Sequence, residues 1–184
     1  MTQTNLPWAA PILVSSLKSN TPRDVALDPT PDICAALADD LGILSIKKLR
    51  LHGTLEPANT RDWHFNGTLG ATVVQACTLS LKPVTTRIDQ TISRRFLAET
   101  PDYEAGSEHE MPEDDTIEPL SDIIDPGQIM AEALALALPD YPRAPDATLE
   151  NAQVTEPGVA PMSDEDARPF AALAGLRDKL QKKS

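Results

Sequence analysis

The sequence predicts an α+β domain in which an antiparallel β-meander is packed by two helices. Three successive segments, 47–55, 63–73 and 84–96, alternate apolar and polar residues with a period of two, which is typical of strands with one buried face. The connections between these segments are short, so neighbouring strands should run antiparallel. Helical apolar patterning appears at 31–41 before the meander and at 128–138 after it.

The meander segments each keep their apolar residues on one side. In the first segment, Leu49, Leu51 and Leu55 alternate with Arg50 and His52. The second and third segments follow the same rule with Trp63, Phe65, Leu69, Ala71, Val73, Val84, Ile88, Ile92 and Phe96. Turn-forming residues at 57–60 and 80–83 separate the segments, and together these features predict one sheet with a single buried face.

Shorter elements precede the meander. Residues 11–16 and 23–27 are predicted to be strands. Thr30 is suited to cap the following helix through its hydroxyl, and Pro31 suits the first helical position. Gly42 is expected to end this helix.

Charge divides the chain into two halves. Residues 1–100 hold ten Lys and Arg against nine Asp and Glu, whereas residues 101–184 hold six against nineteen. We therefore predict an acidic loop at 99–117, and a buried apolar helix at 128–138 that closes the open face of the meander. Residues 1–147 form the predicted domain, followed by a linker at 148–167 and a tethered C-terminal helix and tail at 168–184, which docks on the domain or on a partner.

Composition excludes several classes of protein. The net charge of −12 excludes a uniformly basic nucleic-acid-binding domain, although a basic face on the first half stays open. Cys34 and Cys77 do not make a disulfide framework and are expected to be reduced thiols. No signal peptide and no apolar run of membrane-spanning length is evident, so we expect a cytoplasmic protein without a membrane partner.

No catalytic or metal-binding motif is recognisable. A nucleophilic Cys77 would need a nearby base, but His52 and His64 lie on the polar sides of their strands. CxxC, HExxH and glycine-rich phosphate-binding motifs are absent, and the acidic run at 113–115 lacks the spacing of a calcium site. We expect no enzymatic activity, no cofactor and no small-molecule substrate.

Basic residues in the first and last meander strands form the candidate binding surface. They are Lys47, Lys48, Arg50, Arg87, Arg94 and Arg95. Arg50, Arg87 and Arg95 fall on the polar sides of their strands, so they form a basic face if the strands lie close together. Such a face is either an ordinary solvated sheet surface or a site for RNA phosphates, and the sequence leaves both open.

Several motifs follow one another from residue 73 onward. The first is VVQACTLSLKPV at 73–84, with Cys77 and Pro83. Further positions are Glu118, Leu120, Asp125, Glu132, Pro142 and Arg143, and the closing RPFAAL with Pro169 and Phe170. In this order and spacing, the motifs resemble the YceD family of large ribosomal RNA subunit accumulation proteins. Many family members carry CxxC at the end of this strand and further Cys or His after the buried helix, but here Ser80 follows Cys77 and residues 144–147 offer neither. The resemblance therefore implies no zinc site in this chain.

The resemblance implies a non-enzymatic role in the synthesis, processing or accumulation of 23S rRNA during large-subunit assembly. The implied partner is 23S rRNA or a large-subunit precursor, with a basic ribosomal protein as a further candidate. The alternative is an acidic protein-binding module that shields a basic ribosomal protein without contacting RNA. Salt-dependent binding to 23S rRNA fragments distinguishes the two.

Overall fold

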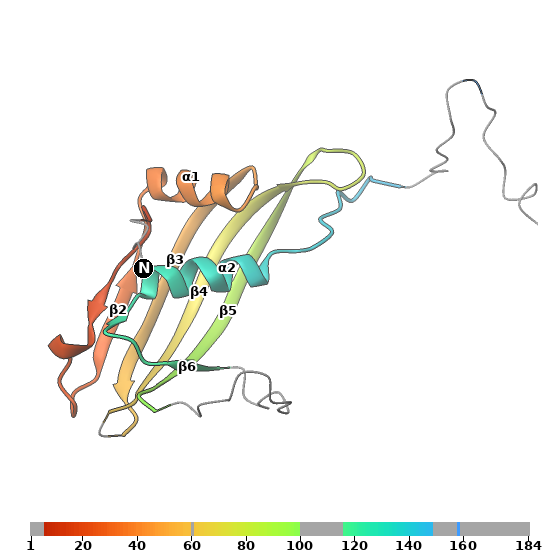
Figure 1. Ribbon diagram of the computed structural model, residues 1–184. Helices are drawn as coiled ribbons and strands as arrows, with labels where there is room; N and C mark the ends of the chain where they lie inside the picture. Colours follow the sequence, from red (N-terminus) through yellow and green to blue (C-terminus); the bar gives the residue numbers. More distant parts are fainter. Residues whose placement is uncertain (1–5, 60, 100–115, 149–157, 159–184) are drawn as a thin grey trace, which may run out of the picture. The chain divides into compact units, whose positions relative to one another are not determined.

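A five-stranded mixed sheet with two helices on one face forms the centre of the fold (Figure 1). The computed structural model describes residues 6–59, 61–99, 116–148 and 158. Its elements are β1 (Ile12–Leu13), a short 3₁₀ helix (Val14–Ser16), β2 (Arg23–Leu27), α1 (Pro31–Asp40), β3 (Ser45–Pro57), β4 (Trp63–Ala76), β5 (Pro83–Leu97), β6 (Ile117–Pro119), β7 (Ile123–Ile124) and α2 (Pro126–Ala137). The predicted α+β class is confirmed.

The predicted meander is the middle of the sheet, whose strand order is β2-β3-β4-β5-β6. β3, β4 and β5 pair antiparallel as neighbours and each is longer than the sequence pattern indicated. β2 adds an antiparallel strand at one side of the sheet, and β6 adds three residues in parallel to the end of β5 at the other.

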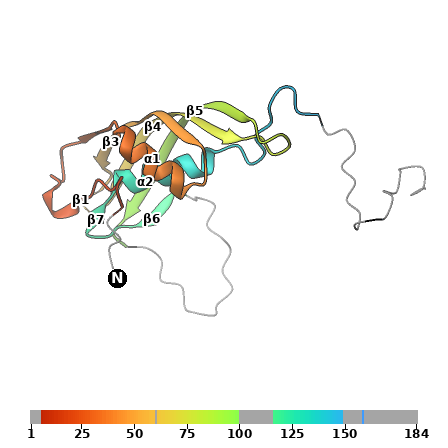
Figure 2. The same ribbon diagram turned by 90° about the horizontal axis from the view of Figure 1, so that it is seen from above.

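Both helices cover the same face of the sheet, as the view from above shows (Figure 2). The apolar sides of β3, β4 and β5 form a core with Leu37 of α1 and with Met130 and Leu134 of α2, all of which are almost fully buried. The expectation that the apolar helix closes the open face is thus confirmed. Burial of each such side chain contributes about 1.5–3 kcal/mol to folding. The opposite face, called the outer face below, carries the polar residues of the strands.

A β-bulge interrupts β3 and changes the side on which its residues lie. The pairing of β3 with β4 shifts between Lys47 and Arg50, and Lys48 has a φ of 53°, in the left-handed region. The extra residue allows Ile46 and Leu49 both to face the core, although an odd spacing in a regular strand would put them on opposite faces. The alternation in the sequence did not predict this bulge.

Several predicted boundaries are wrong. Only Ile12 and Leu13 of the strand predicted at 11–16 are extended, because Leu17 donates a hydrogen bond back to Val14 and closes a 3₁₀ turn. The acidic loop predicted at 99–117 ends earlier, because Ile117 already pairs with Arg95 in β6.

The helix termini differ in part from the prediction. Thr30 occupies the N-cap of α1 but makes no side-chain capping hydrogen bond, so Pro31 and the backbone define this end. α2 begins at Pro126, two residues before the predicted start, because Asp125 caps it by accepting from Gly127 N at 2.9 Å and Gln128 N at 3.3 Å.

Parts of the predicted organisation lie outside the described residues. These are residues 100–115 of the acidic loop, nearly all of the linker at 148–167 and the C-terminal helix and tail at 168–184, including Pro169 and Phe170. The domain boundary at residue 147 stays a prediction.

Candidate nucleic-acid interface

Two adjacent cross-strand rows on the outer face bring basic residues of β3 and β5 together. One row aligns Lys47 of β3, Thr72 of β4 and Arg87 of β5, and the next aligns Arg50, Gly70 and Asp89. β4 lies between the two basic strands, so side chains from β3 and β5 have to reach across it. We call Lys47, Lys48, Arg50 and Arg87 the outer-face cluster.

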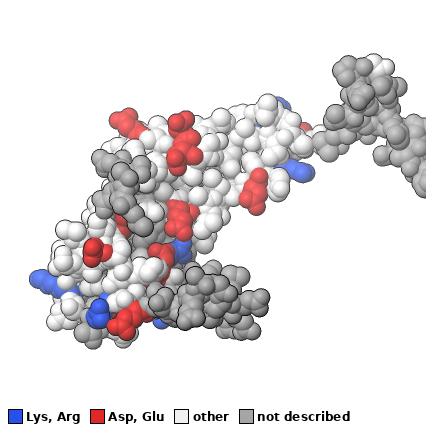
Figure 3. All heavy atoms as spheres, in the orientation of Figure 1, with Lys and Arg blue, Asp and Glu red and all other residues white. Residues whose placement is uncertain are grey.

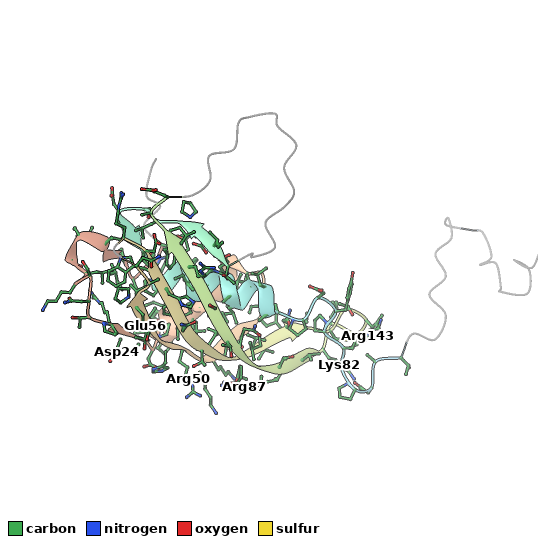
Figure 4. The ribbon with its side chains drawn as sticks, turned by 90° about the horizontal axis from the view of Figure 1, so that it is seen from below. Asp24, Arg50, Glu56, Lys82, Arg87 and Arg143 are labelled. Carbon is green, nitrogen blue, oxygen red and sulfur yellow. The ribbon has the colours of Figure 1, made fainter. Side chains whose placement is uncertain are left out.

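Gly70 makes this approach possible. A Cβ atom at this position would lie 2.7 Å from Nη2 of Arg87 and 3.0 Å from Nε of Arg50. Both guanidinium groups therefore lie over the backbone of β4, in the space that any other residue would fill. Figure 4 shows the two labelled arginines next to each other on the underside of the sheet.

One carboxylate partly balances these charges. Arg87 donates two hydrogen bonds to Asp89, from Nε at 2.8 Å and from Nη2. These hydrogen bonds, with a smaller contribution from the charge of Arg50, hold the pKa of Asp89 below its usual value. The same hydrogen bonds raise the pKa of Arg87. Among the described residues, Arg50 has no carboxylate within ion-pair distance. A surface ion pair such as Arg87–Asp89 is weak enough, at about 0–1 kcal/mol, to exchange for an external anion.

The bulge in β3 places Lys48 beside Arg50 and Arg87. An open depression of about 480 Å³ is lined by Asp28, Lys48, Leu49, Arg50, Thr72 and Arg87. Its cationic groups outnumber its one carboxylate, and guanidinium groups bind phosphate oxygens through several parallel N–H donors. The arrangement can hold one or two backbone phosphates, and it has no pocket that selects a base.

Arg95 and Arg94 do not join the outer-face cluster. Arg95 shares the outer face with Arg87, but it lies eight residues further along β5, opposite His64, or about 26 Å away at about 3.3 Å per residue. Arg94 points to the helix-covered face and has a side chain only 17% exposed. The interpretation that places it on a common basic face is therefore wrong.

Arg94 instead joins three elements of the fold. Its Nε lies 2.9 Å from Oε1 of Glu118 in β6, an ion pair without hydrogen-bond geometry, and its Nη2 donates to Oε1 of Glu132 in α2 at 3.3 Å. Burial, together with the nearby Glu132 carboxylate, raises the pKa of Glu118 despite the opposing effect of Arg94. Glu118 and Glu132, both matched by the family resemblance, thus have a structural role here.

Cys77 is the centre of the turn between β4 and β5. Its side chain is fully buried, and its Sγ accepts from the backbone N–H of Ser80 at 3.5 Å and of Ala144 at 3.3 Å. Hydrogen bonding from Ser80 and Ala144 lowers the pKa of Cys77 to about 6, against the burial that would raise it. His52 and His64 contact Asp28 and Ser93 instead, so neither is placed as a base for this thiol.

The segment after α2 is tied to this turn by further contacts. The carbonyl of Pro142 accepts from Thr78 N at 3.0 Å, Gln75 Nε2 donates to the carbonyl of Pro139 at 3.2 Å, and Lys82 pairs with Asp146. Pro142 is buried and Arg143 is exposed near Lys82 at the far end of the sheet (Figure 4). These contacts hold the segment with Pro142 against the turn that contains Cys77 and leads into β5 at Pro83.

The remaining family position with a local role is Asp125. Besides capping α2, its Oδ1 accepts from Ala10 N at 2.8 Å, and a Cβ at the neighbouring Gly127 would lie 1.9 Å from the carbonyl oxygen of Trp8. Asp125 and Gly127 therefore fasten the segment around Trp8 and Ala10 to α2. Leu120 packs at the edge of the same core.

The groups around Cys77 do not fit a zinc site. Ser80 and Ala144 approach the sulfur with backbone N–H groups, and Asp146 is engaged by Lys82. In the described part of the chain, no group of three or more His, Cys, Asp or Glu side chains could hold a metal ion. The described helices are also all too short or too polar to cross a membrane.

Comparison with known protein families matches residues 65–177, more than half of the chain, to the family described as "Large ribosomal RNA subunit accumulation protein YceD". The matched range starts in β4 and includes Arg87 but not Lys47, Lys48 or Arg50. Neither the curated proteins nor the solved structures contain a match. The matched range contains the motifs that carry the resemblance, and the chain belongs to the YceD family of large ribosomal RNA subunit accumulation proteins.

Proposed function

We propose that this protein supports accumulation of 23S rRNA in the cytoplasm by binding rRNA phosphates through the outer-face cluster, without catalysing a reaction. The observation that carries the proposal is the convergence of Arg50 and Arg87 over Gly70. Two guanidinium groups from non-neighbouring strands approach each other although their charges repel. An anion placed between them relieves that repulsion and accepts their hydrogen bonds.

The chemistry of the cluster favours the sugar–phosphate backbone as the ligand. Its donors are flexible cationic groups on an open surface, which suits positioning contacts to phosphate and not readout of base edges. We therefore expect little sequence selectivity from this surface alone. Selectivity for large-subunit rRNA then depends on RNA shape or on a second contact.

Titration of the full chain with single-stranded 23S rRNA fragments at several salt concentrations tests the proposal. If all four cations of the cluster contact phosphates, the logarithm of affinity falls with the logarithm of salt with a slope of about −3. Arg50→Ala should lower affinity and make this slope shallower by about 0.7–0.9. Arg23→Ala is the matched control, because Arg23 is an exposed arginine on β2 of the same sheet and outside the cluster.

The rival function gives the opposite results. An acidic module that shields a basic ribosomal protein binds that protein and shows no affinity for rRNA even at low salt. Most of the acidic residues on which it depends lie at 101–115, outside the described residues. An Arg50→Ala variant with unchanged RNA affinity and unchanged salt slope would also contradict the proposed interface.

A further inference from the structure

One side of β5 is an unusually long open edge. β5 has 15 residues, but β6 pairs only with Arg95, Phe96 and Leu97. Within the described residues, no strand lies beside the preceding part of β5 on this side. An exposed strand edge offers unpaired backbone donors and acceptors to another strand.

The direction of the backbone groups along this edge follows from the contacts of β6. Arg95 N donates to the carbonyl of Thr116, and the carbonyl of Leu97 accepts from Leu120 N, each at 2.8 Å. Odd-numbered residues of β5 therefore direct their N–H and C=O groups away from β4. The pairing of β5 with β4 runs from Pro83 to Phe96 without a shift, so the same parity applies to Thr85, Arg87, Asp89, Thr91 and Ser93.

The sequence of β5 is complementary to itself when read in reverse about Ile88. Arg87 then lies opposite Asp89, Thr85 opposite Thr91, and Val84 opposite Ile92. We propose that a second copy of this chain pairs antiparallel with this edge, β5 against β5, with a two-fold axis at Ile88. The product is a dimer with one continuous sheet across both copies.

This register satisfies the backbone and the charges together. It pairs odd residues with odd residues, so the outward backbone groups of the two copies meet and form hydrogen-bonded pairs. Each Arg87 lies directly opposite the partner's Asp89. The two nearest registers of the same parity place Arg87 opposite the partner's Arg87 or Asp89 opposite the partner's Asp89, and like charges directly opposite each other destabilise a sheet.

The surroundings of the edge also fit a second strand. In this register, the partner's Pro83 lies opposite Ser93, and the pairing ends there. The pairing of β6 with β5 begins at Arg95, so the partner strand does not displace β6. A depression of about 320 Å³ runs beside this edge between β5 and α2, with Ile92, Ala133, Leu136 and Ala137 in its lining. Leu136 is 76% exposed and adds apolar surface to this depression. The two-fold axis puts both helix-covered faces on the same side, where the partner's Val84 would lie next to Ile92 and cover this apolar strip.

Sedimentation equilibrium of the full chain tests the dimer. We expect a dimer, and Asp89→Arg should raise its dissociation constant at least about tenfold, because each dimer contains the Arg87–Asp89 pair twice. The exchanged variant Arg87→Asp/Asp89→Arg restores complementarity and should return the dissociation constant toward that of the original chain. Circular dichroism of each variant confirms that the sheet is formed.

A second pair of variants tests the backbone edge itself. Thr91→Pro removes an outward N–H without removing a hydrogen bond to β4, so it should abolish the dimer, whereas Thr91→Ala should not. Thr86 and Gln90 of opposite copies form a non-hydrogen-bonded pair, whose Cα spacing of about 4.5 Å suits a disulfide. Oxidised Thr86→Cys/Gln90→Cys should therefore run as a cross-linked dimer, and Gln90→Cys alone should not.

Two results would overturn the proposed dimer. One is a chain that stays monomeric at every concentration and gives no cross-link in the double-cysteine variant. The other is a dimer that neither Asp89→Arg nor Thr91→Pro weakens, because that dimer would use another surface. Neither result bears on RNA binding by Arg50, which lies on β3 and outside the paired strand.

Discussion

At the scale of single residues, the most informative positions are those where a side chain is absent or unusually placed. Gly70 is a polar-side position of a long central strand, where glycine is normally unfavourable. The glycine itself is visible in the sequence. Its role in the basic surface is not, because only the strand register shows that Arg50 and Arg87 flank it.

Gly70→Ala should separate RNA binding from stability. The added Cβ would meet the ends of two flexible arginines, so we expect the free energy of unfolding to change by no more than about 1 kcal/mol. RNA affinity should fall, because the guanidinium groups can no longer converge. Thermal melts and RNA titration measure both quantities.

Gly67→Ala is the contrasting variant on the same strand. Its Cβ would lie 2.9 Å from the carbonyl oxygen of His52, a backbone atom that cannot move aside. This variant should lose stability markedly. An unstable Gly70→Ala, or one with unchanged RNA affinity, would contradict the role given to Gly70.

The Cys77 thiol should make stability depend on pH. Its folded pKa of about 6 lies below the value near 9 expected in the unfolded chain. A depressed pKa contributes stability that is fully present above the unfolded pKa and is lost as pH falls through the folded pKa. The difference in unfolding free energy between the original chain and Cys77→Ala should therefore shrink between about pH 9 and pH 6. Denaturant titrations across this range measure it, and a pH-independent difference would show that the thiol stays protonated.

At the scale of elements, the sequence predicted the strands and helices well but not their irregular positions. Period-two patterning identified β3, β4 and β5 because one face of each is buried. It did not reveal the bulge at Lys48, since a lysine in the left-handed region leaves no mark in the hydrophobic pattern. It also missed β6, because three residues are too short for a period to appear.

The turn between β4 and β5 contains strain that one substitution should relieve. Leu81 has a φ of 57° and is 76% exposed, so its side chain contributes little packing at an unfavourable backbone conformation. Leu81→Gly should raise the free energy of unfolding by about 1 kcal/mol. Leu44→Gly is the control, because Leu44 is exposed but has an ordinary φ, and it should lower stability. Chemical denaturation distinguishes the two signs.

Arg94 joins β5, β6 and α2, and its removal should have a pH-dependent cost. Arg94→Ala leaves Glu118 and Glu132 facing each other without a cation. The pKa of Glu118 is already raised in the folded protein, so folding favours its protonated form. The destabilisation should be large at pH 7.5 and smaller at a more acidic pH, because the carboxyl group takes up a proton as the pH falls. A loss of stability that is equal at both pH values would argue against this interpretation.

At the scale of the whole molecule, the outer-face cluster is a local group of basic residues in an acidic protein. Asp and Glu side chains are spread over the helix-covered face, and Lys and Arg lie mainly near its margins (Figure 3). The outer-face cluster lies on the opposite side. The sequence predicted a basic surface within an acidic protein, but it overestimated its extent. Arg94 lies on the helix-covered face because it is an even-numbered residue of β5, next to β6. Arg95 lies far from Arg87 because β5 is long.

Complementation of cells depleted of this protein tests the central claim most directly, with the ratio of 23S to 16S rRNA as the measured quantity. The variant Lys47→Ala/Lys48→Ala/Arg50→Ala removes three cations of the outer-face cluster without altering the residues matched to the family or the β5 edge. We expect this variant, at a protein level equal to that of the original chain, to leave the ratio low, while Arg23→Ala restores it. A triple variant that restores the ratio fully would contradict the claim that this surface acts on large-subunit rRNA.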